Sequence, residues 1–157
     1  MGWGILSLAL IGACALLLVS AGIEDVRKRE IANWKNAAIA LMAPAWWWSI
    51  GLGLWPGVAI QVALAAVVFA IFVGAFALGQ MGGGDVKLIG AVALWLPFQP
   101  LAWMLVAMSL IGGVLTLLLI VERWLRRTDA PIEVPYGVAI VIPTLFALRE
   151  PILNGFW

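Results

Sequence analysis

Residues 81–100 read MGGGDVKLIGAVALWLPFQP, and this stretch decides how many times the chain crosses a membrane. Its apolar part holds about eleven residues before Pro97, or roughly 17 Å of helix at 1.5 Å per residue. A hydrocarbon core is about 30 Å thick, so this segment is too short to cross it alone. Pro97 and Pro100 interrupt the apolar run, because proline breaks a helix interior. We therefore expect a short helix near 86–96 and a separate full helix near 101–121.

The whole chain is strongly apolar. Of its 157 residues, 65% are hydrophobic and 11% are charged, whereas a soluble domain carries roughly 25% charged residues. The charges are clustered, and they are absent from 1–23, 36–84, 88–121 and 134–148. The first three of these runs are long enough for membrane helices, which need about 20 apolar residues. The composition predicts an all-α integral membrane protein, with a single transmembrane domain over 1–157.

The uncharged runs divide into six transmembrane helices. The first run fits one span and the second fits two, and the third supplies the short and the long helix described above. The fourth run is short, but it can extend toward the C-terminus to form the last span. The turn within the second run is marked by Gly51, Gly53, Pro56 and Gly57.

The positions of Lys and Arg support six spans, because cytoplasmic loops carry an excess of positive charge. With six spans, the odd-numbered loops share one side and hold eight of the nine Lys and Arg residues. These are Arg27, Lys28, Arg29, Lys35, Lys87, Arg123, Arg126 and Arg127, and only Arg149 lies on the other side. With five spans, the last three of the eight would move to the opposite side. We therefore expect cytoplasmic odd-numbered loops and both termini outside.

The residue inventory excludes several kinds of site. The chain has no histidine, which excludes Ser-His-Asp and Cys-His catalysis, bis-histidine haem and histidine metal clusters. Its single cysteine, Cys14, cannot form a disulfide within the chain or a multi-cysteine zinc site. The net charge of +1 does not indicate nucleic-acid binding. We therefore expect no metal, no cofactor and no nucleic acid, with the lipid bilayer as the surroundings.

Asp85 stands out among the acidic residues. It follows Gly82, Gly83 and Gly84 and starts the helix that is too short to reach both membrane surfaces. A carboxylate at membrane depth costs on the order of 2.5–3.5 kcal/mol and usually has a function or a partner. Glycines permit irregular backbone, which a membrane tolerates where it lines a water-filled cavity or is buried in protein. A glycine-rich turn with Asp85 as the N-cap of the next helix explains the same residues equally well.

Asp25 is the second candidate, at the inner end of the first span. The parity of the spans places Asp25 and Asp85 on the same face of the membrane. Two carboxylates in a partly dry cavity tend to share one proton, and such a pair can activate water for attack on a carbonyl. We expect these two residues to form a catalytic dyad. Helical spacing also fits ordinary surface pairs of Asp25 with Arg29 and of Glu24 with Lys28.

Three segments resemble the type IV prepilin peptidase family. Residues 25–33, DVRKREIAN, resemble its first aspartate motif, and 82–88, GGGDVKL, resemble the second, Gly-x-Gly-Asp followed by lysine. Residues 134–140, VPYGVAI, resemble a third segment at the start of the last helix. The segments stand in the family's order. The short chain is similar to the CpaA/TadV-like form, which serves Flp-like pili, and to archaeal preflagellin peptidases.

The resemblance implies a GxGD-type aspartic endopeptidase of the inner membrane, with Asp25 and Asp85 as its catalytic pair. Its substrate would be a prepilin, cut at the cytoplasmic face after a glycine, ahead of an apolar helix with a glutamate near its start. Lys87 can pair with that glutamate or tune the dyad, although a snorkelling role at the membrane boundary fits as well. Lys87 and the three glycines before Asp85 are the candidate substrate-binding residues.

Two features depart from the family's pattern, and a second class of function remains open. Ala32 stands where the family usually has proline, in the first aspartate motif. The long bacterial forms carry an inserted cytosolic segment with paired cysteines, linked to N-methylation of the product. This chain lacks both, so the resemblance does not carry methyltransferase activity over to it. The alternatives are a small ion- or proton-coupled transporter with Asp85 as its ion site, and an assembly factor without activity.

Overall fold

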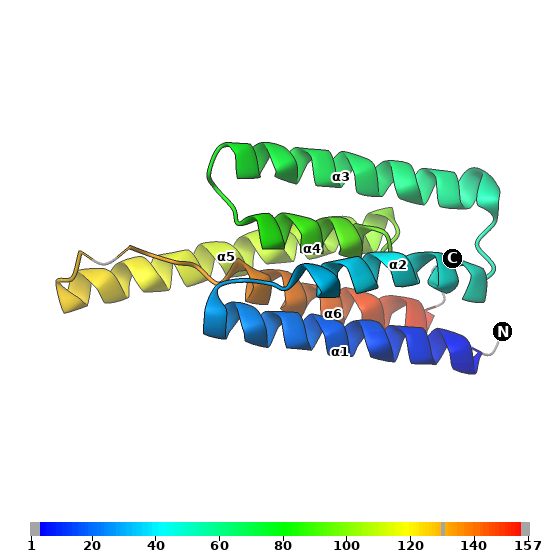
Figure 1. The fold of residues 1–157 in the computed structure, drawn as a ribbon, viewed down its shortest axis with the longest axis horizontal. Helices are drawn as coiled ribbons and strands as arrows, with labels where there is room; N and C mark the ends of the chain where they lie inside the picture. Colours follow the sequence, from blue (N-terminus) through cyan, green and yellow to red (C-terminus); the bar gives the residue numbers. More distant parts are fainter. Residues whose placement is uncertain (1–3, 130, 155–157) are drawn as a thin grey trace.

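The computed structural model describes residues 4–129 and 131–154, with side chains through Arg149, and these residues form a helical bundle (Figure 1). Its elements are α1 (Ile5–Lys28), α2 (Asn33–Ser49), the short turn η1 (Leu54–Val58), α3 (Ala59–Ala77), α4 (Gly83–Ala93), α5 (Phe98–Arg126) and α6 (Tyr136–Asn154). The described part of the chain is all-helical, as the composition predicts. The terminal residues 1–3 and 155–157, whose side of the membrane was an expectation, lie outside the described residues.

The expected break between the fourth and fifth helices is present, but only one proline makes it. α4 ends at Ala93, and Pro97 is the N-cap residue of α5. Pro100 lies in the first turn of α5, where the backbone N–H has no partner within the helix, so the missing donor has no cost. The expectation that Pro100 helps to interrupt the helix was therefore wrong. The glycine-rich turn after α2 is also present, with Gly51 at a φ of 72°, where glycine is favoured.

Three helical segments are long and apolar enough to cross a membrane, namely α1, the segment Leu54–Ala77, which joins η1 and α3, and α5. Tyr136–Arg149 of α6 is apolar but shorter, and α2 and α4 hold only 17 and 11 residues. Helix length by itself therefore supports three membrane spans. The six-span arrangement stays a prediction that depends on how the shorter helices are packed.

The short helix α4 is the central element of the bundle. It packs against α2, α3 and α6, and α6 in turn packs against α1 and α5 (Figure 1). Leu88, Ile89, Val92 and the following Trp95 are almost fully buried, so α4 is covered on nearly all sides. α5 runs beside α6 and extends beyond the other helices at its C-terminal end (Figure 1). A helix too short to cross a membrane is thus enclosed by longer ones.

Side chains of neighbouring helices satisfy the backbone where α4 ends. The last carbonyls of a helix have no partner within it, and hydrocarbon supplies none. The Nε2 of Gln61 on α3 donates to the carbonyl oxygens of Ala93 and Leu96, each at 2.7 Å. The Nε1 of Trp47 on α2 donates to the carbonyl oxygen of Leu94 at 2.8 Å. These bonds let α4 stop inside the bundle.

Two stacked tryptophans fix α2 against the segment that follows α4. The rings of Trp46 and Trp95 lie 5.6 Å apart between centroids, at an interplanar angle of 20°. The Nε1 of Trp95 donates to the carbonyl oxygen of Ile39 at 2.9 Å. Each buried indole thus contributes a large apolar surface, and Trp95 also makes a directed bond to α2.

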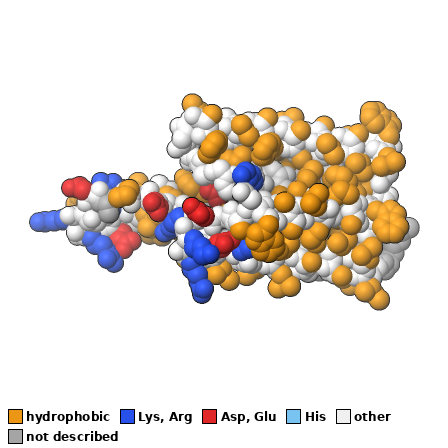
Figure 2. Space-filling model, in the orientation of Figure 1, with side chains coloured by type: hydrophobic (Ala, Val, Ile, Leu, Met, Phe, Trp, Pro, Cys, Tyr) orange, Lys and Arg blue, Asp and Glu red, His pale blue; other side chains and the backbone are white. Residues whose placement is uncertain are grey.

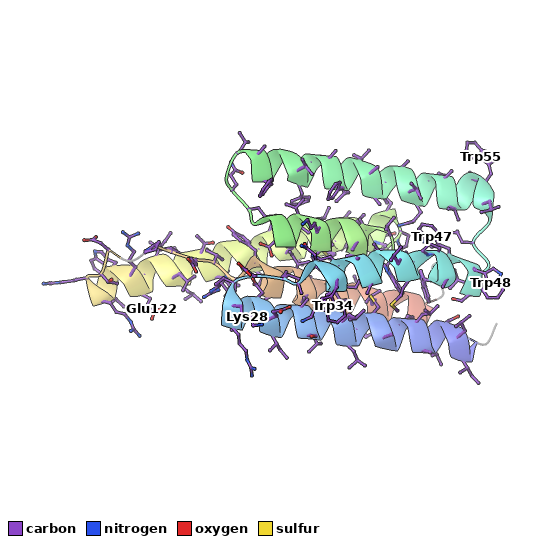
Figure 3. The ribbon with its side chains drawn as sticks, in the orientation of Figure 1. Lys28, Trp34, Trp47, Trp48, Trp55 and Glu122 are labelled. Carbon is purple, nitrogen blue, oxygen red and sulfur yellow. The ribbon has the colours of Figure 1, made fainter. Side chains whose placement is uncertain are left out.

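The bundle has a charged end and an apolar end. Figure 2 shows charged side chains gathered at the end where α1 and α5 finish, while the rest of the visible face is mainly hydrophobic. Lys28 and Glu122 lie at the charged end, whereas the exposed Trp48 and Trp55 lie at the opposite end (Figure 3). This polarity agrees with the expected placement of the odd-numbered loops on one side.

Candidate active site

Four helix ends meet at the charged end of the bundle. The C-terminus of α1 and the N-termini of α2, α4 and α6 lie there (Figure 1). A helix N-terminus presents unpaired N–H groups and attracts negative charge. Asp25, in the last turn of α1, and Asp85, in the first turn of α4, are 5% and 8% exposed. Both predicted site aspartates are therefore buried at this end.

The carboxylate of Asp25 is held by the beginning of α6. The backbone N–H of Gly137 donates to Oδ2 of Asp25 at 2.9 Å, and the N–H of Val138 also interacts with this carboxylate. These residues are the second and third of α6, so the carboxylate lies at the N-terminus of that helix. Asp25 is thus buried and bound to backbone, and it does not form the alternative surface ion pair with Arg29.

Position 137 must be a glycine because its backbone lies so close to Asp25. A Cβ atom at position 137 would lie 2.8 Å from the Cβ, Cγ and Oδ2 atoms of Asp25, which is closer than real Cβ contacts. Gly137 belongs to the third motif, for which the sequence predicted no role at this residue. The only sequence signal for a role was that the motif lies at the start of a helix. Its pairing with Asp25, 112 residues earlier, was not readable from sequence.

Asp85 interacts with the turn that precedes α4. Gly82 is the N-cap residue, with φ −71° and ψ 147°, and Asp85 is the third residue of the helix. The carboxylate of Asp85 interacts with the Gly82 N–H, in the arrangement of half a capping box. The alternative that made Asp85 itself the N-cap was therefore wrong in position, although the side chain does help to start the helix. The charges of Asp25 and Asp85 interact electrostatically.

The glycines before Asp85 allow close packing by other segments. A Cβ atom at Gly84 would lie 3.3 Å from the side chain of Ile31, in the loop between α1 and α2. A Cβ atom at Gly83 would lie 3.4 Å from the ring of Phe76 on α3. A Cβ atom at Gly82 would lie 3.1 Å from Oδ2 of Asp85 itself. The three glycines thus let α4 start close to its neighbours, and their expected contact with substrate stays a prediction.

Hydrogen bonds join the first and second aspartate motifs. The Nζ of Lys87 donates to Oδ1 of Asn33 at 2.8 Å on the surface of the site. The Nδ2 of Asn36 donates to the carbonyl oxygen of Gly84 at 3.2 Å. The N-termini of α2 and α4 are therefore linked directly beside Asp85. Lys87 was identifiable from sequence, whereas Asn36 was missed because it lies outside the quoted motifs.

A partly buried ion pair fixes the loop between α1 and α2. Oε2 of Glu24 lies 2.8 Å from Nζ of Lys35, which also donates to the Ser20 carbonyl oxygen at 3.2 Å. The same Glu24 oxygen accepts the backbone N–H of Ala32 at 3.2 Å. The alternative pair of Glu24 with Lys28 also exists, but at 3.7 Å and with an exposed lysine. Ala32 thus supplies a donor that proline, the usual family residue, lacks.

The model of the type IV leader peptidase family matches residues 10–117. This range runs from α1 into α5 and includes both Asp25 and Asp85. It covers more than half of the chain, and α6 follows it. No curated protein and no solved structure matches the chain significantly.

Proposed function

The chain belongs to the type IV leader peptidase family, and we propose that it is an aspartic endopeptidase that removes the leader of a Flp-like type IV prepilin. One observation carries the proposal. Asp25 and Asp85, from the two aspartate motifs, are buried together at the charged end of an apolar bundle. Buried acidic residues in such a setting are usually functional, because their burial is costly.

In the proposed membrane arrangement, the chain passes through the inner membrane six times with its charged end facing the cytoplasm, and the short α4, enclosed by the other helices, makes the fourth pass together with the residues that follow it. The enclosure of α4 by α2, α3 and α6 supports this arrangement, as do the side-chain bonds at its C-terminus. An 11-residue helix inside a membrane needs such partners, because lipid offers no hydrogen bonds. The catalytic pair then lies at the inner boundary of the membrane.

The proposed reaction uses the two carboxylates as a unit with one shared proton. The ionised carboxylate accepts a proton from water as the water oxygen attacks the scissile carbonyl carbon, and the protonated one donates to the carbonyl oxygen. The tetrahedral intermediate then collapses: the C–N bond breaks, the leaving amine takes the proton of the protonated carboxyl, and a hydroxyl of the intermediate gives its proton to the ionised carboxylate, which restores the one-proton dyad. Because both groups titrate as a pair, base and acid belong to the dyad rather than to one residue.

The substrate is proposed to lie with its leader in the cytosol and its apolar helix in the membrane. The bond to be cut must be extended at the dyad, because a helical peptide bond is shielded and its carbonyl is engaged. Lys87 is proposed to contact the acidic residue of the substrate, which its exposed position beside Asp85 supports.

The first prediction tests the dyad. Asp25→Asn and Asp85→Asn, assayed in membranes with a candidate prepilin, should each lose processing by at least about 10³-fold, because neither can complete the proton transfers. The double variant should lose no more than either single variant, since the two residues act as a unit. Leader removal is measured as a mass shift.

Asp129→Asn is the matched control, because Asp129 is fully exposed and forms only a 3.8 Å ion pair with Arg123. It should process the prepilin like the wild type. Full processing by Asp25→Asn or Asp85→Asn, in protein that accumulates normally, would rule out the dyad. Proton flux in liposomes that depends on Asp85, without cleavage, would favour the transporter alternative instead.

A further inference from the structure

A groove of about 520 Å³ runs between α2 and α3, with α4 as its floor. Its lining includes the larger Val62, Phe69 and Leu94, but most of it is small, namely Ala37 and Ala40 on α2, Ala65 and Ala66 on α3, and Gly90 and Ala91 on α4. Small residues let another helix approach closely, and close approach drives helix association in membranes. The shape therefore suits a helix better than a compact ligand.

One end of the groove is polar. Lys87 and Asn33, joined by their 2.8 Å hydrogen bond, line it at the same end as the catalytic pair. Among the described residues that line this groove, Lys87 is the single charged side chain. Its charge is complementary to an acidic group on an occupant. Apart from Asn36, the rest of the groove is apolar, so the acidic group would sit at the cytoplasmic end of an apolar segment.

Asn36 supplies an independent indication of an occupant. It lines the groove, is 4% exposed, and uses its Nδ2 to bind the carbonyl oxygen of Gly84. Within the described part of the chain, its Oδ1 has no hydrogen-bond partner. Buried acceptors nearly always have a hydrogen-bond donor, so the missing donor of this oxygen points to a bound molecule that supplies one. A backbone N–H of an extended peptide would provide one, directly beside the residue that precedes Asp85.

We infer that this groove, which we call the α2–α4 groove, is the docking site of the substrate's apolar helix, an inference that rests on the proposed function. The helix lies on α4 between α2 and α3, with its acidic side chain paired to Lys87. The chain then leaves the helix at the polar end of the groove, where Asn36 binds its extended backbone. It continues toward Asp85, two residues before Lys87 in α4.

A second groove, between α5 and α6, offers a comparison. Its volume is about 410 Å³, and Trp103, Ala107 and Phe146 are among the residues that line it. Among the described residues, no charged side chain lines it, and it lies along the first half of α5, away from the starts of α2 and α4. It therefore lacks both the complementary charge and the orphaned acceptor of the α2–α4 groove. We use it as the matched control.

Crosslinking tests the occupant directly. The background is Cys14→Ser with Asp85→Asn, which removes the single native thiol and prevents turnover. The probe is a synthetic prepilin with a basic leader, a glycine, an acidic residue and about 20 apolar residues, with one cysteine in mid-helix. Ala66→Cys should form a disulfide with the probe, and Ala107→Cys should not. Crosslinking at position 107 instead of 66 would overturn the assignment.

The same experiment separates other occupants. A disulfide dimer of the Ala66→Cys protein that the probe does not compete away would assign the groove to a second copy. Protection of the introduced thiol from a small thiol reagent in lipid alone, unchanged by the probe, would assign the groove to lipid chains. Either result would overturn the inference.

Kinetics in the active protein give the second measurement. Ala66→Trp fills the groove and should raise KM about tenfold with kcat unchanged, because it removes binding and not chemistry. Ala107→Trp, in the control groove, should leave both parameters unchanged. Lys87→Glu should weaken cleavage of the acidic probe. The same variant should cleave a probe normally when lysine replaces the probe's acidic residue.

These outcomes distinguish the inference from the proposed function. If the wild type fails to cleave the probe while Asp85→Asn still crosslinks through position 66, the peptidase function fails and the docking site stands. If the wild type cleaves the probe but Ala66→Trp is kinetically normal and position 66 does not crosslink, the docking site alone fails.

Discussion

At the residue scale, backbone donors hold Asp25 in place, and the charge of Arg29 acts on its carboxylate as well. Gly137 and Val138 interact with its carboxylate through their N–H groups at the start of α6. Backbone groups move only with their helix, so they hold a carboxylate more rigidly than a long flexible side chain would. The position of Asp25 therefore depends on how closely α6 approaches α1.

The second prediction tests this approach. Gly137→Ala adds a Cβ 2.8 Å from the carboxyl group of Asp25, so α6 or the aspartate must move. Prepilin cleavage should fall about 10²-fold, since displacements on the order of 1 Å cost that much in catalysis. The rate is measured as leader release in detergent-solubilised enzyme.

Gly12→Ala is the control for the glycine substitution. Gly12 lies in α1, and a Cβ atom there meets nothing within 4 Å, so the rate should stay at the wild-type value. Wild-type cleavage by Gly137→Ala would contradict the role given to this close contact.

The third prediction concerns the ion pair beside the site. Lys35→Met removes the partner of Glu24 and the bond to the Ser20 carbonyl, whereas Lys28→Met removes only a loose surface contact. Lys35→Met should therefore lower the midpoint of thermal unfolding clearly more than Lys28→Met. Adding Glu24→Gln to Lys35→Met should cost less than the two single changes combined, because the residues share one interaction. Equal midpoints for the two lysine variants would contradict this.

At the element scale, the short helix α4 depends on donors from its neighbours. Its C-terminal carbonyls accept bonds from Gln61 on α3 and from Trp47 on α2. These contacts permit α4 to end inside the bundle, and its start then brings Asp85 to the charged end. The length of α4 and the place of the site are therefore linked.

The fourth prediction tests this dependence. Gln61→Leu keeps a side chain of similar size but leaves the carbonyl oxygens of Ala93 and Leu96 without this donor. The free energy of unfolding should fall by about 1–3 kcal/mol, the cost of orphaned buried acceptors. Denaturant titration in detergent measures it. Gln80→Leu, at an exposed turn, should change stability little, and an equal loss there would contradict the explanation.

At the scale of the whole molecule, the charged side chains gather at one end of the bundle. Lys28 and Glu122 lie at one end of the bundle, and Trp48 and Trp55 lie at the other (Figure 3). α5 holds 29 residues, or about 43 Å of helix, which exceeds a hydrocarbon core of about 30 Å. Its basic C-terminal turns therefore extend past the bundle on the charged side.

The fifth prediction tests the six-span arrangement. In a Cys14→Ser background, single cysteines introduced by Lys28→Cys and Asp129→Cys should react with an impermeant thiol reagent only from the cytoplasmic side. The thiol of Gly53→Cys should react only from outside, because an even number of spans separates the first two positions and an odd number separates each from the third. Labelling is scored in right-side-out and inverted vesicles. Opposite sidedness for positions 28 and 129 would contradict the six-span arrangement, because it would mean that an odd number of spans separates them.

The sequence alone was sufficient to predict the helices, the charged end and the family. Helix breaks follow from local chemistry, because Pro97 and the turn glycines act on the residues next to them. The clustering of charge was equally visible, since solvation of Lys and Arg does not depend on the fold. The two aspartates were identifiable because so few charged residues occur in the apolar chain.

Only the tertiary structure decided what surrounds the two aspartates. The bond from Gly137 to Asp25 spans 112 positions, and that from Gln61 to Leu96 spans 35. The closer pair that Glu24 forms with Lys35, beside its pair with Lys28, is likewise set by packing, as is the orphaned acceptor of Asn36. Long uncharged apolar runs determine that helices form, but the apolar surfaces of these helices are too alike to determine which helix ends meet. Close packing and the need to satisfy buried polar groups make that choice.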